Sequence, residues 1–451
     1  MTGISNVLAA RALQCFSDAD RDAAWRALFD TVTVGVGAWA HEAAALKAII
    51  GLVCEGRPDG PVRVPGHARP LPAPQAAAVL ALACHSIDCD DTYMEGGVKT
   101  HISAIVVPAA FAVAQAVDAS MEALLDAICA GIEVEARLGH LVVPVMVQRW
   151  HPTGTLGPIG AAAAAARLLG LDAAQTEQAL GLAGDAAAGT RVCLDQGDAS
   201  KSMHAAYAAR HGVEAALLVA RGAIGPVGFF EARQGYLDSY VGGHVADWGP
   251  DGARVHANSV KFYPAMHALH AAIRALVDLR QAHGAGEAAS ITVTQSSTHA
   301  RFGRATDPKT PLAARLSLTY CAAASWLDGA CGFAQFTPQR LFDPALRALM
   351  TRVHVEGSEA LERDFPNRIA SRVEVQLTGG RRLEAFVADP PGCPQNPATE
   401  AMYRNKMTEL LEPATDPAAR QAWLAEFTAR RTTSARALAA LAPRPLGARH
   451  D

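Results

Sequence analysis

HPTGTLGPIGAAAAAARLLG, residues 151–170, decides the fold class, because a turn rich in glycine and proline runs directly into an alanine-rich segment. Proline and glycine favour turns, whereas alanine has the highest helix propensity of all residues. The alanine-rich segment is apolar nearly all round, which is typical of a helix buried within a layer of other helices. The stretch therefore predicts a protein of closely packed helices.

The same pattern continues on both sides of this stretch. Between residues 75 and 225, alanine-rich helical segments alternate with glycine and proline breaks, and helical periodicity also marks residues 1–50 and the chain after residue 397. Near residue 285 the pattern changes. Residues 290–295 alternate with period two, and residues 372–389 form two alternating runs around Gly379-Gly380, which is a hairpin signal. We expect an α+β segment between helical segments.

Charge, apolar runs and cysteine spacing exclude several classes of protein. The chain has 451 residues, a net charge of -4 and no basic block, so we expect no nucleic-acid partner. Its apolar runs are too short or too interrupted to span a bilayer, and the N-terminus lacks the pattern of a signal peptide. Nine scattered cysteines contain no C-x-x-C pair, which favours reduced thiols over disulfides or a cysteine-based zinc site. These features predict a cytoplasmic protein without a membrane partner.

An acidic turn at Asp88, Asp90 and Asp91 lies between two apolar segments. Buried carboxylates are costly unless other groups balance their charge. The spacing Asp90-Asp91-x-x-x-Glu95 is similar to the magnesium-binding motif of terpenoid synthases, and hard cations do prefer carboxylate oxygens. A second acidic motif on another helix is missing from the sequence. On spacing alone, a solvated turn is the simpler interpretation.

Several basic residues lie in apolar surroundings. His151 precedes a proline, which keeps it out of helical geometry, close to a helix N-terminus that could face an anion. Lys201 and His204 are three residues apart and share a helix face, and Lys261 lies between apolar and aromatic residues. Each lysine needs a carboxylate or a ligand if it is buried. The alternatives are a turn histidine with an ordinary hydrogen bond and lysines that extend to the surface. Tyr320 is most simply a core aromatic residue.

Five segments, taken in order, resemble the MmgE/PrpD family, which includes 2-methylcitrate dehydratase, cis-aconitate decarboxylase and iminodisuccinate epimerase. The segments are HSIDCDDTYMEGGVKTHISAIVVPAAFA (85–112), WHPTGTLGPIGAAAAAARLLGLD (150–172), KSMHAAYAARHGVEAALLVARGAIGP (201–226), VKFYPAMHALHAAI (260–273) and DPPGCPQNPATEAMYRNK (389–406). Departures from the family pattern, such as Ile102 after His101 and Ala206 after the lysine–histidine pair, leave the substrate open.

The resemblance implies a cofactor-free, metal-free enzyme that forms a homodimer. It also implies a mainly α fold, in which residues 1–264 and 393–451 build a large all-α helical domain and residues 265–392 form an inserted α+β lid domain. The active site is expected between the two domains. Carried over residue by residue, the catalytic set is Asp88, His101, His151, Lys201, Lys261 and Tyr320, and Thr92 is expected to bind the substrate. Arg191 and His204 are two further residues that we expect to bind the substrate.

The reactions of this family share a carbanion-like centre next to a carboxylate. Lysines can hold the carboxylates and offset the developing negative charge, and a histidine can carry the proton. We therefore predict a lyase that acts on a small di- or tricarboxylate and is similar to 2-methylcitrate dehydratase. An epimerase of the iminodisuccinate type and a decarboxylase of the cis-aconitate type are alternatives. A magnesium-dependent prenyl-type synthase and a non-catalytic carboxylate-binding protein are more distant ones.

Overall fold

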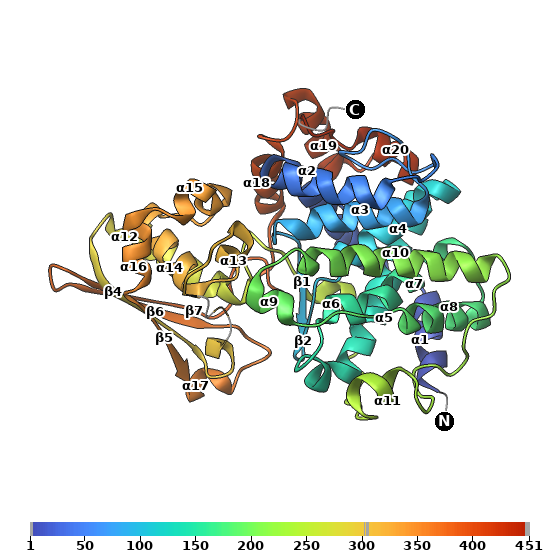
Figure 1. The fold of residues 1–451 in the computed structure, drawn as a ribbon, viewed down its shortest axis with the longest axis horizontal. Coiled ribbons are helices and arrows are strands. Elements are labelled where there is room, and N and C mark those ends of the chain that lie inside the picture. The colour runs from blue at the N-terminus through green and yellow to red at the C-terminus, as the bar shows by residue number, and fades with distance from the viewer. Residues whose placement is uncertain (1–2, 302, 304–305, 447–451) are drawn as a thin grey trace.

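The computed structural model describes residues 3–301, 303 and 306–446. Its buried apolar side chains form two separate hydrophobic cores. The larger core combines residues 8–260 with residues 403–442, and the smaller one lies within residues 265–383. Figure 1 shows the corresponding two bodies, with the lid to one side of the helical body. The two ends of the chain therefore pack into the same body, and the lid is an insertion between them.

The larger body is built mainly from helices. They are α1 (Ile4–Leu13), α2 (Asp18–Cys54), α3 (Ala73–Ser86), α4 (Ser103–Val117), α5 (Met121–Met146), α6 (Pro152–Thr155), α7 (Gly157–Leu168), α8 (Ala173–Asp185), α9 (Val192–Gln196), α10 (Ser200–Ala220), α11 (Tyr236–Val241), α18 (Glu400–Leu411), α19 (Pro417–Ala429) and α20 (Ala435–Leu441).

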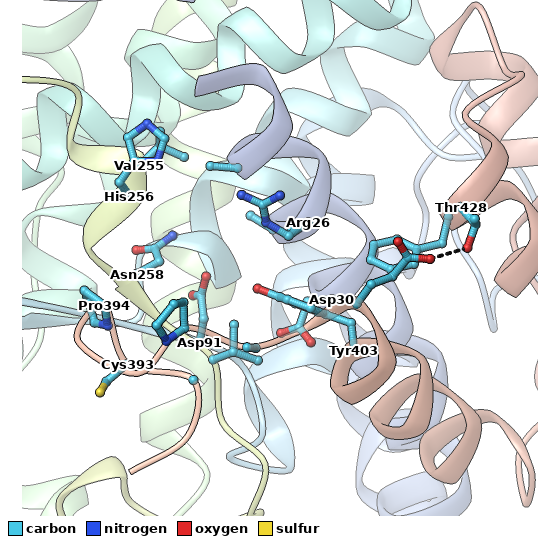
Figure 2. A pocket seen from close by; sticks show the side chains of 18 of the residues that line it. Arg26, Asp30, Asp91, Val255, His256, Asn258, Cys393, Pro394, Tyr403 and Thr428 are labelled. Atoms are coloured by element: carbon cyan, nitrogen blue, oxygen red, sulfur yellow. Dashed lines mark hydrogen bonds between the residues drawn. The ribbon is translucent and has the colours of Figure 1, made fainter. Parts of the chain in front are cut away.

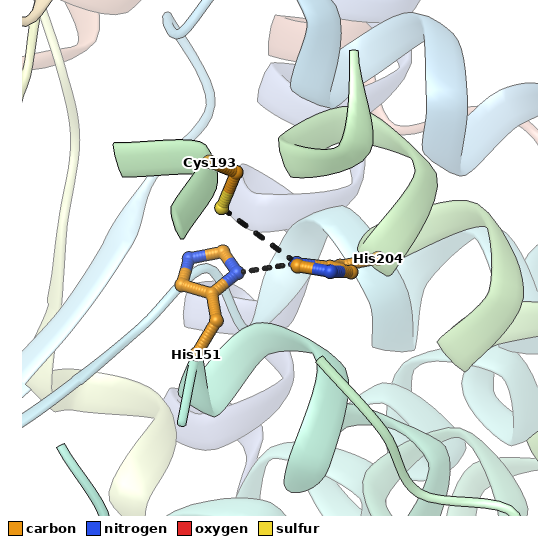
Figure 3. Close-up of side chains that lie close together, drawn as sticks. All are labelled: His151, Cys193 and His204. Atoms are coloured by element: carbon orange, nitrogen blue, oxygen red, sulfur yellow. Dashed lines mark hydrogen bonds between the residues drawn. The ribbon is translucent and has the colours of Figure 1, made fainter. Parts of the chain in front are cut away.

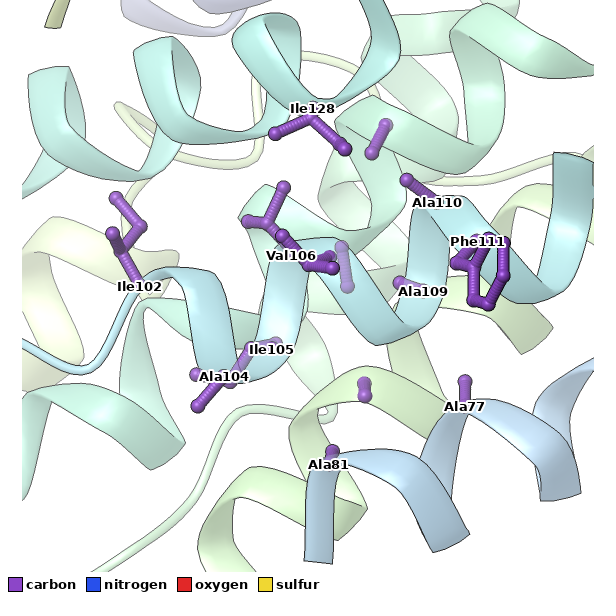
Figure 4. Close-up of a cluster of buried hydrophobic side chains, with 14 of the residues drawn as sticks. Ala77, Ala81, Ile102, Ala104, Ile105, Val106, Ala109, Ala110, Phe111 and Ile128 are labelled. Atoms are coloured by element: carbon purple, nitrogen blue, oxygen red, sulfur yellow. The ribbon is translucent and has the colours of Figure 1, made fainter. Parts of the chain in front are cut away.

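Small residues let these helices approach closely. On α4, Val106 and Phe111 belong to the buried cluster of Figure 4, together with Ala77 of α3 and Ile128 of α5. A Cβ atom added at Gly212 of α10 would lie 2.4 Å from the Cβ of Ala161 in α7, which is well inside van der Waals contact. The alanine-rich segments thus form the packed helical layer that their composition predicts.

The fold class predicted from the sequence is wrong, because the larger body is not all-α. It contains a three-stranded antiparallel sheet in the order β2-β1-β3, made of Thr92–Glu95, Val98–Thr100 and Asn258–Ser259. The turn between β1 and β2 is Gly96-Gly97, and both glycines have positive φ (56° and 89°), as a two-residue hairpin requires. With the sheet of the lid, the protein is a mixed α/β structure in which helices dominate.

The lid packs helices on a four-stranded sheet of order β5-β4-β6-β7. Strand β4 pairs in parallel with β5 and antiparallel with β6, which continues into β7 through the predicted Gly379-Gly380 turn. The strands are β4 (Ala288–Ser296), β5 (Val353–Ser358), β6 (Ser371–Leu377) and β7 (Arg382–Val387), and the helices are α12 (His270–His283), α13 (Pro311–Arg315), α14 (Leu318–Asp328), α15 (Pro338–Leu341), α16 (Pro344–Met350) and α17 (Glu359–Glu362).

The length and composition of the helices determine whether any of them could span a bilayer. Within the described residues, no single helix is long and apolar enough to cross a bilayer. One strongly bent pair of segments, residues 18–42 and 45–54, reaches the required length and apolarity when the two are taken together.

Candidate active site

Asp88 is the centre of the candidate site and lies between two lysines that are distant in the sequence. Its Oδ1 accepts hydrogen bonds from Lys201 Nζ at 3.2 Å and from Lys261 Nζ at 2.8 Å. Each of the three residues is at most 1% exposed. Burial on its own would raise the pKa of Asp88, but the two ammonium groups outweigh it and hold this pKa well below its usual range. Asp88 is therefore an ionised carboxylate that balances both lysines.

Local structure explains how these side chains meet. Asp88 follows the end of α3 and has a left-handed backbone, with φ at 52°, which aspartate tolerates better than most residues. Lys201 lies in the first turn of α10, which packs against α3. Lys261 follows β3, and the antiparallel pairing of Thr92 with Ser259 places it alongside the acidic turn that precedes β1. The small sheet therefore positions one of the two lysines.

Asp90 connects two histidines to this centre. Its Oδ2 lies 2.8 Å from Nδ1 of both His85 and His101. Burial would raise the pKa of Asp90, but the histidines and Lys261 hold it well below its usual range, so the carboxylate accepts a hydrogen bond from each ring. The Nε2 atom of His85 lies 3.1 Å from Lys201 Nζ. The tautomer set by Asp90 leaves the lone pair of His101 on Nε2, where the ring can accept a proton.

A second group of side chains continues from His101. The rings of His101 and His151 are 6.5 Å apart between centroids. His151 precedes α6, and its Nδ1 lies 3.0 Å from Nδ1 of His204 on α10. The Sγ atom of Cys193 on α9 lies 4.0 Å from the same His204 nitrogen. A dashed line marks this contact in Figure 3. The structure therefore brings the predicted residues Asp88, His101, His151, Lys201, His204 and Lys261 into one connected group.

Three further predicted residues lie in different surroundings. Thr92 begins β1 and is buried, and its Oγ1 has no hydrogen-bond partner among the described residues. Arg191 donates from Nη1 to the carbonyl of Val147. The structure does not bring Tyr320 to the cluster. It lies on the buried face of α14 within the core of the lid, and its hydroxyl donates to the carbonyl of Gln335 at 2.5 Å.

The magnesium-type spacing does not produce a converging set of carboxylates. Asp90 faces the two histidines, Asp91 accepts from Ser103 Oγ at 2.5 Å, and Glu95 pairs with Arg254. Burial raises the pKa of Asp91 to about 7. Because the three carboxylates have different partners, the spacing reflects separate structural roles.

A cavity of about 520 Å³ lies on the Asp91 side of the acidic turn. Figure 2 shows that Asp91, Arg26, Asp30 and Tyr403 line it, together with the loop around Cys393. Neither Asp88 nor the two lysines belong to its lining. Around Asp88, the ion pairs with the two lysines occupy the centre of the site.

Sequence reasoning missed three residues of this region: His85, Asp90 and Arg315. His85 occupies the last turn of an apolar helix, and a buried histidine three residues before Asp88 is the signal that could have indicated it. Asp90 was expected to belong to the acidic turn, either solvated or as a metal ligand, and its role as a partner of two histidines was not predicted. Arg315 ends α13 in the lid, and its Nη1 reaches Glu42 Oε1 at 3.1 Å and the Ser86 carbonyl at 3.4 Å in the helical body. No sequence motif marks this contact.

Arg315→Gln is expected to weaken closure of the lid over the site. The lost charged contact corresponds to about 1.5–3 kcal/mol, so we expect KM to rise by roughly 10-fold, with a smaller change in kcat. Steady-state kinetics would measure both, and limited proteolysis would report a loosened lid. Arg340→Gln is the matched control, because this arginine pairs with Asp328 inside the lid. Equal effects of the two substitutions would contradict a role in closure.

Stability is expected to fall as the pH drops below about 6.5, the ordinary histidine pKa. Burial lowers the pKa of His101 and of His270 to about 3, and of His41 to about 4. Between those values and 6.5 the unfolded chain binds more protons than the folded one, so the free energy of unfolding decreases on acidification. Lowered pKa values are shared by eight histidines: His41, His85, His101, His151, His204, His267, His270 and His299.

Carboxyl groups with raised pKa values increase the free energy of unfolding on acidification, but they are fewer than the eight histidines. They are Asp30, Asp91, Glu135 and Glu409. A single histidine shifted as far as His270 corresponds to about 1.4 kcal/mol per pH unit. His270→Gln should therefore flatten the plot of unfolding free energy against pH by about that slope. Chemical denaturation between pH 5 and 7.5 would measure the slope, and a flat profile for the unaltered protein would contradict the argument.

Comparisons with known proteins identify a family and several relatives. The profile of the MmgE/PrpD N-terminal domain matches residues 3–248, and that of the MmgE/PrpD C-terminal domain matches residues 263–429. Human cis-aconitate decarboxylase is 29% identical over 308 residues, which cover 63% of this chain and 62% of the human protein. The cis-aconitate decarboxylase-like protein oryM of Aspergillus oryzae is 27% identical over 89% of this chain and 88% of its own length. Cis-aconitate decarboxylase of Aspergillus terreus is 24% identical over 80% and 79%.

Proposed function

The chain belongs to the MmgE/PrpD family, and from this premise we propose that it is a lyase that forms a carbanion-like centre next to a carboxylate of a small di- or tricarboxylate. The observation that carries the proposal is the buried contact of Asp88 with both Lys201 and Lys261. Two ammonium groups on one carboxylate form a site that already holds an oxyanion. A substrate carboxylate can share or replace Asp88 there, and the lysines then offset the negative charge that develops in the transition state.

His101 is the proton carrier in this proposal. Asp90 fixes its Nδ1 side, so Nε2 is the atom that takes or returns the proton. Its pKa of about 3 reflects burial beside cationic groups. An anionic substrate at the same place acts in the opposite direction and raises this pKa, which makes His101 a competent base only when substrate is bound. His151 supports the same step from its place beside His101.

The specific reaction depends on the group that the substrate loses, which is either CO2 or hydroxide. Decarboxylation expels CO2 and then adds a proton to the carbanion, whereas dehydration removes a proton and expels hydroxide. The relatives described above carry the name cis-aconitate decarboxylase, so cis-aconitate is the first substrate to test. Dehydration of 2-methylcitrate, the activity expected from the sequence, is the second candidate, and it needs the same lysines and histidine.

A proton NMR assay in D2O with cis-aconitate, 2-methylcitrate, citrate and iminodisuccinate tests the proposal. CO2 loss, dehydration and deuterium incorporation without net change each give a different spectrum. EDTA should not lower turnover, which distinguishes this lyase from a magnesium-dependent synthase. Melting shifts without turnover of any substrate would instead support a carboxylate-binding protein and overturn the proposal. The homodimer and the cytoplasmic location are further proposals, and sedimentation would test the first.

A further inference from the structure

His151, Cys193 and His204 form a cluster that the proposed reaction does not fully use. One possible ligand atom from each, a ring nitrogen of each histidine and Sγ of the cysteine, lies within 4.8 Å of the other two. They come from three separate elements, since His151 precedes α6, Cys193 lies on α9 and His204 lies on α10. Cys193 is 1% exposed and His151 is 4% exposed, whereas His204 is half-buried and lies at the edge of the group. Figure 3 shows the three side chains converging on one point.

The spacing fits a tetrahedral ion. With Zn–N near 2.1 Å and Zn–S near 2.3 Å, tetrahedral angles place two ligand nitrogens about 3.4 Å apart and a nitrogen and a sulfur about 3.6 Å apart. The observed separations are 3.0 Å between the two nitrogens and 4.0 Å from Cys193 Sγ to His204. Each of these two separations differs from its tetrahedral value by about 0.4 Å, and the third, between Cys193 and His151, is within 4.8 Å. Three protein ligands also leave a fourth position open for water or a substrate oxygen.

We propose that His151, Cys193 and His204 bind one thiophilic divalent ion of the zinc class, and that this ion inhibits the enzyme. A thiolate and two imidazoles are ligands that zinc and cobalt(II) prefer, whereas magnesium prefers oxygen. The second group with suitable spacing, His85, Asp90 and His101, is less suited to a cation, because the ammonium of Lys201 already contacts His85.

Metal binding releases one proton from the protein and changes the tautomer of one histidine. The thiol of Cys193 loses one proton to solvent and binds as a thiolate. One of the two facing histidines carries its hydrogen on Nδ1 in the metal-free protein, and on binding this hydrogen moves to Nε2, so both rings stay neutral. The ion then holds the Nδ1 lone pair of His151, and Nε2 carries the hydrogen. Such a ring has no lone pair left to accept a proton, and this part of the inference rests on the proposed role of His151 in catalysis.

Cobalt(II) alone is the probe of the site. Added to the metal-free protein in stoichiometric amount, it should give visible bands of a tetrahedral ion, a thiolate-to-cobalt charge-transfer band in the near ultraviolet, and release of about one proton per ion. Cys193→Ser should lose the charge-transfer band. Cys15→Ser is the matched control, since Cys15 is an exposed thiol, and it should keep the band. The spectra need no substrate, so they report on the site even if the proposed reaction fails.

Zinc titration of turnover tests the inhibitory role. Each variant is compared with its own metal-free rate, and Cys193→Ser should need at least about 10-fold more zinc for half-inhibition than Cys15→Ser. No charge-transfer band in the unaltered protein, or the same band in Cys193→Ser, would overturn the site. A band that disappears in Cys193→Ser without any zinc inhibition would overturn the inhibitory role. If Cys193→Ser does not fold, the spectra of the unaltered protein and of Cys15→Ser still decide whether the thiolate ligand exists.

Discussion

Lys201→Met is expected to lower kcat/KM by a factor of about 10²–10³, the usual loss when one preorganised group that stabilises an oxyanion is removed. The ammonium of Lys201 contacts Asp88 at 3.2 Å and His85 at 3.1 Å, so it supports both the carboxylate site and the histidine network. Methionine has a similar length and no charge. Because Lys261 still pairs with Asp88, the substitution leaves no buried carboxylate without a partner, and we expect the protein to stay folded.

Lys309→Met is the control for this substitution, because Lys309 is an exposed lysine of the lid that pairs with Asp307. It should leave both kcat and KM within a factor of about two, as expected for an exposed ion pair. Melting temperatures of both variants would separate a loss of chemistry from a loss of fold. Turnover of Lys201→Met within threefold of the unaltered protein would remove the proposed site.

Most of the site residues are predictable because their types are unusual for their surroundings. Lys201 and Lys261 interrupt apolar segments, and a buried lysine requires a carboxylate. Asp88 supplies it for both. The helical body is predictable for a related reason, since alanine-rich segments without a polar face can only be buried.

The small sheet was missed because its strands are very short and its third strand lies far away in the sequence. Strand β1 has four residues and β2 has three. Gly96-Gly97 is a hairpin signal, but the strands on either side of it are too short to show an alternating pattern. Strand β3 carries two residues, and its pairing with Tyr93 spans more than 160 positions. Local periodicity cannot report such a pairing, although it is the pairing that aligns Lys261 with Asp88.

Tyr320 is a different case, because its assignment to the site rests on family resemblance alone. Its own sequence context, an apolar helix in the lid, already suggested a core aromatic residue. The structure places it with Phe336 in the lid core, where its hydroxyl is satisfied by a backbone carbonyl. Arg315, which does cross from the lid to the helical body, has no comparable motif.

Lys406→Met is expected to lower the free energy of unfolding by about 3–5 kcal/mol, because it leaves a buried carboxylate without its cation. Lys406 Nζ lies 2.7 Å from Asp30 Oδ1, and the two side chains are 4% and 3% exposed. The pair joins α18 near the C-terminus to α2 near the N-terminus, so it fastens the two ends of the chain that form one body. Lys406 also donates to the Cys89 carbonyl at 2.9 Å, inside the acidic turn.

Two further variants test whether the loss of stability comes from the unpaired buried charge of Asp30 or from removal of a long side chain. Arg430→Met breaks the pair of Arg430 with Asp22, which is nearly half exposed on both sides, and should cost less than about 1 kcal/mol. The double variant Asp30→Asn/Lys406→Met removes the orphaned charge and should recover part of the loss. Urea denaturation would measure all three. If Lys406→Met lowers the free energy of unfolding by less than about 1 kcal/mol, Asp30 is already neutral in the folded protein. In that case Lys406 supports the turn that carries Asp88 only through its hydrogen bond to the Cys89 carbonyl.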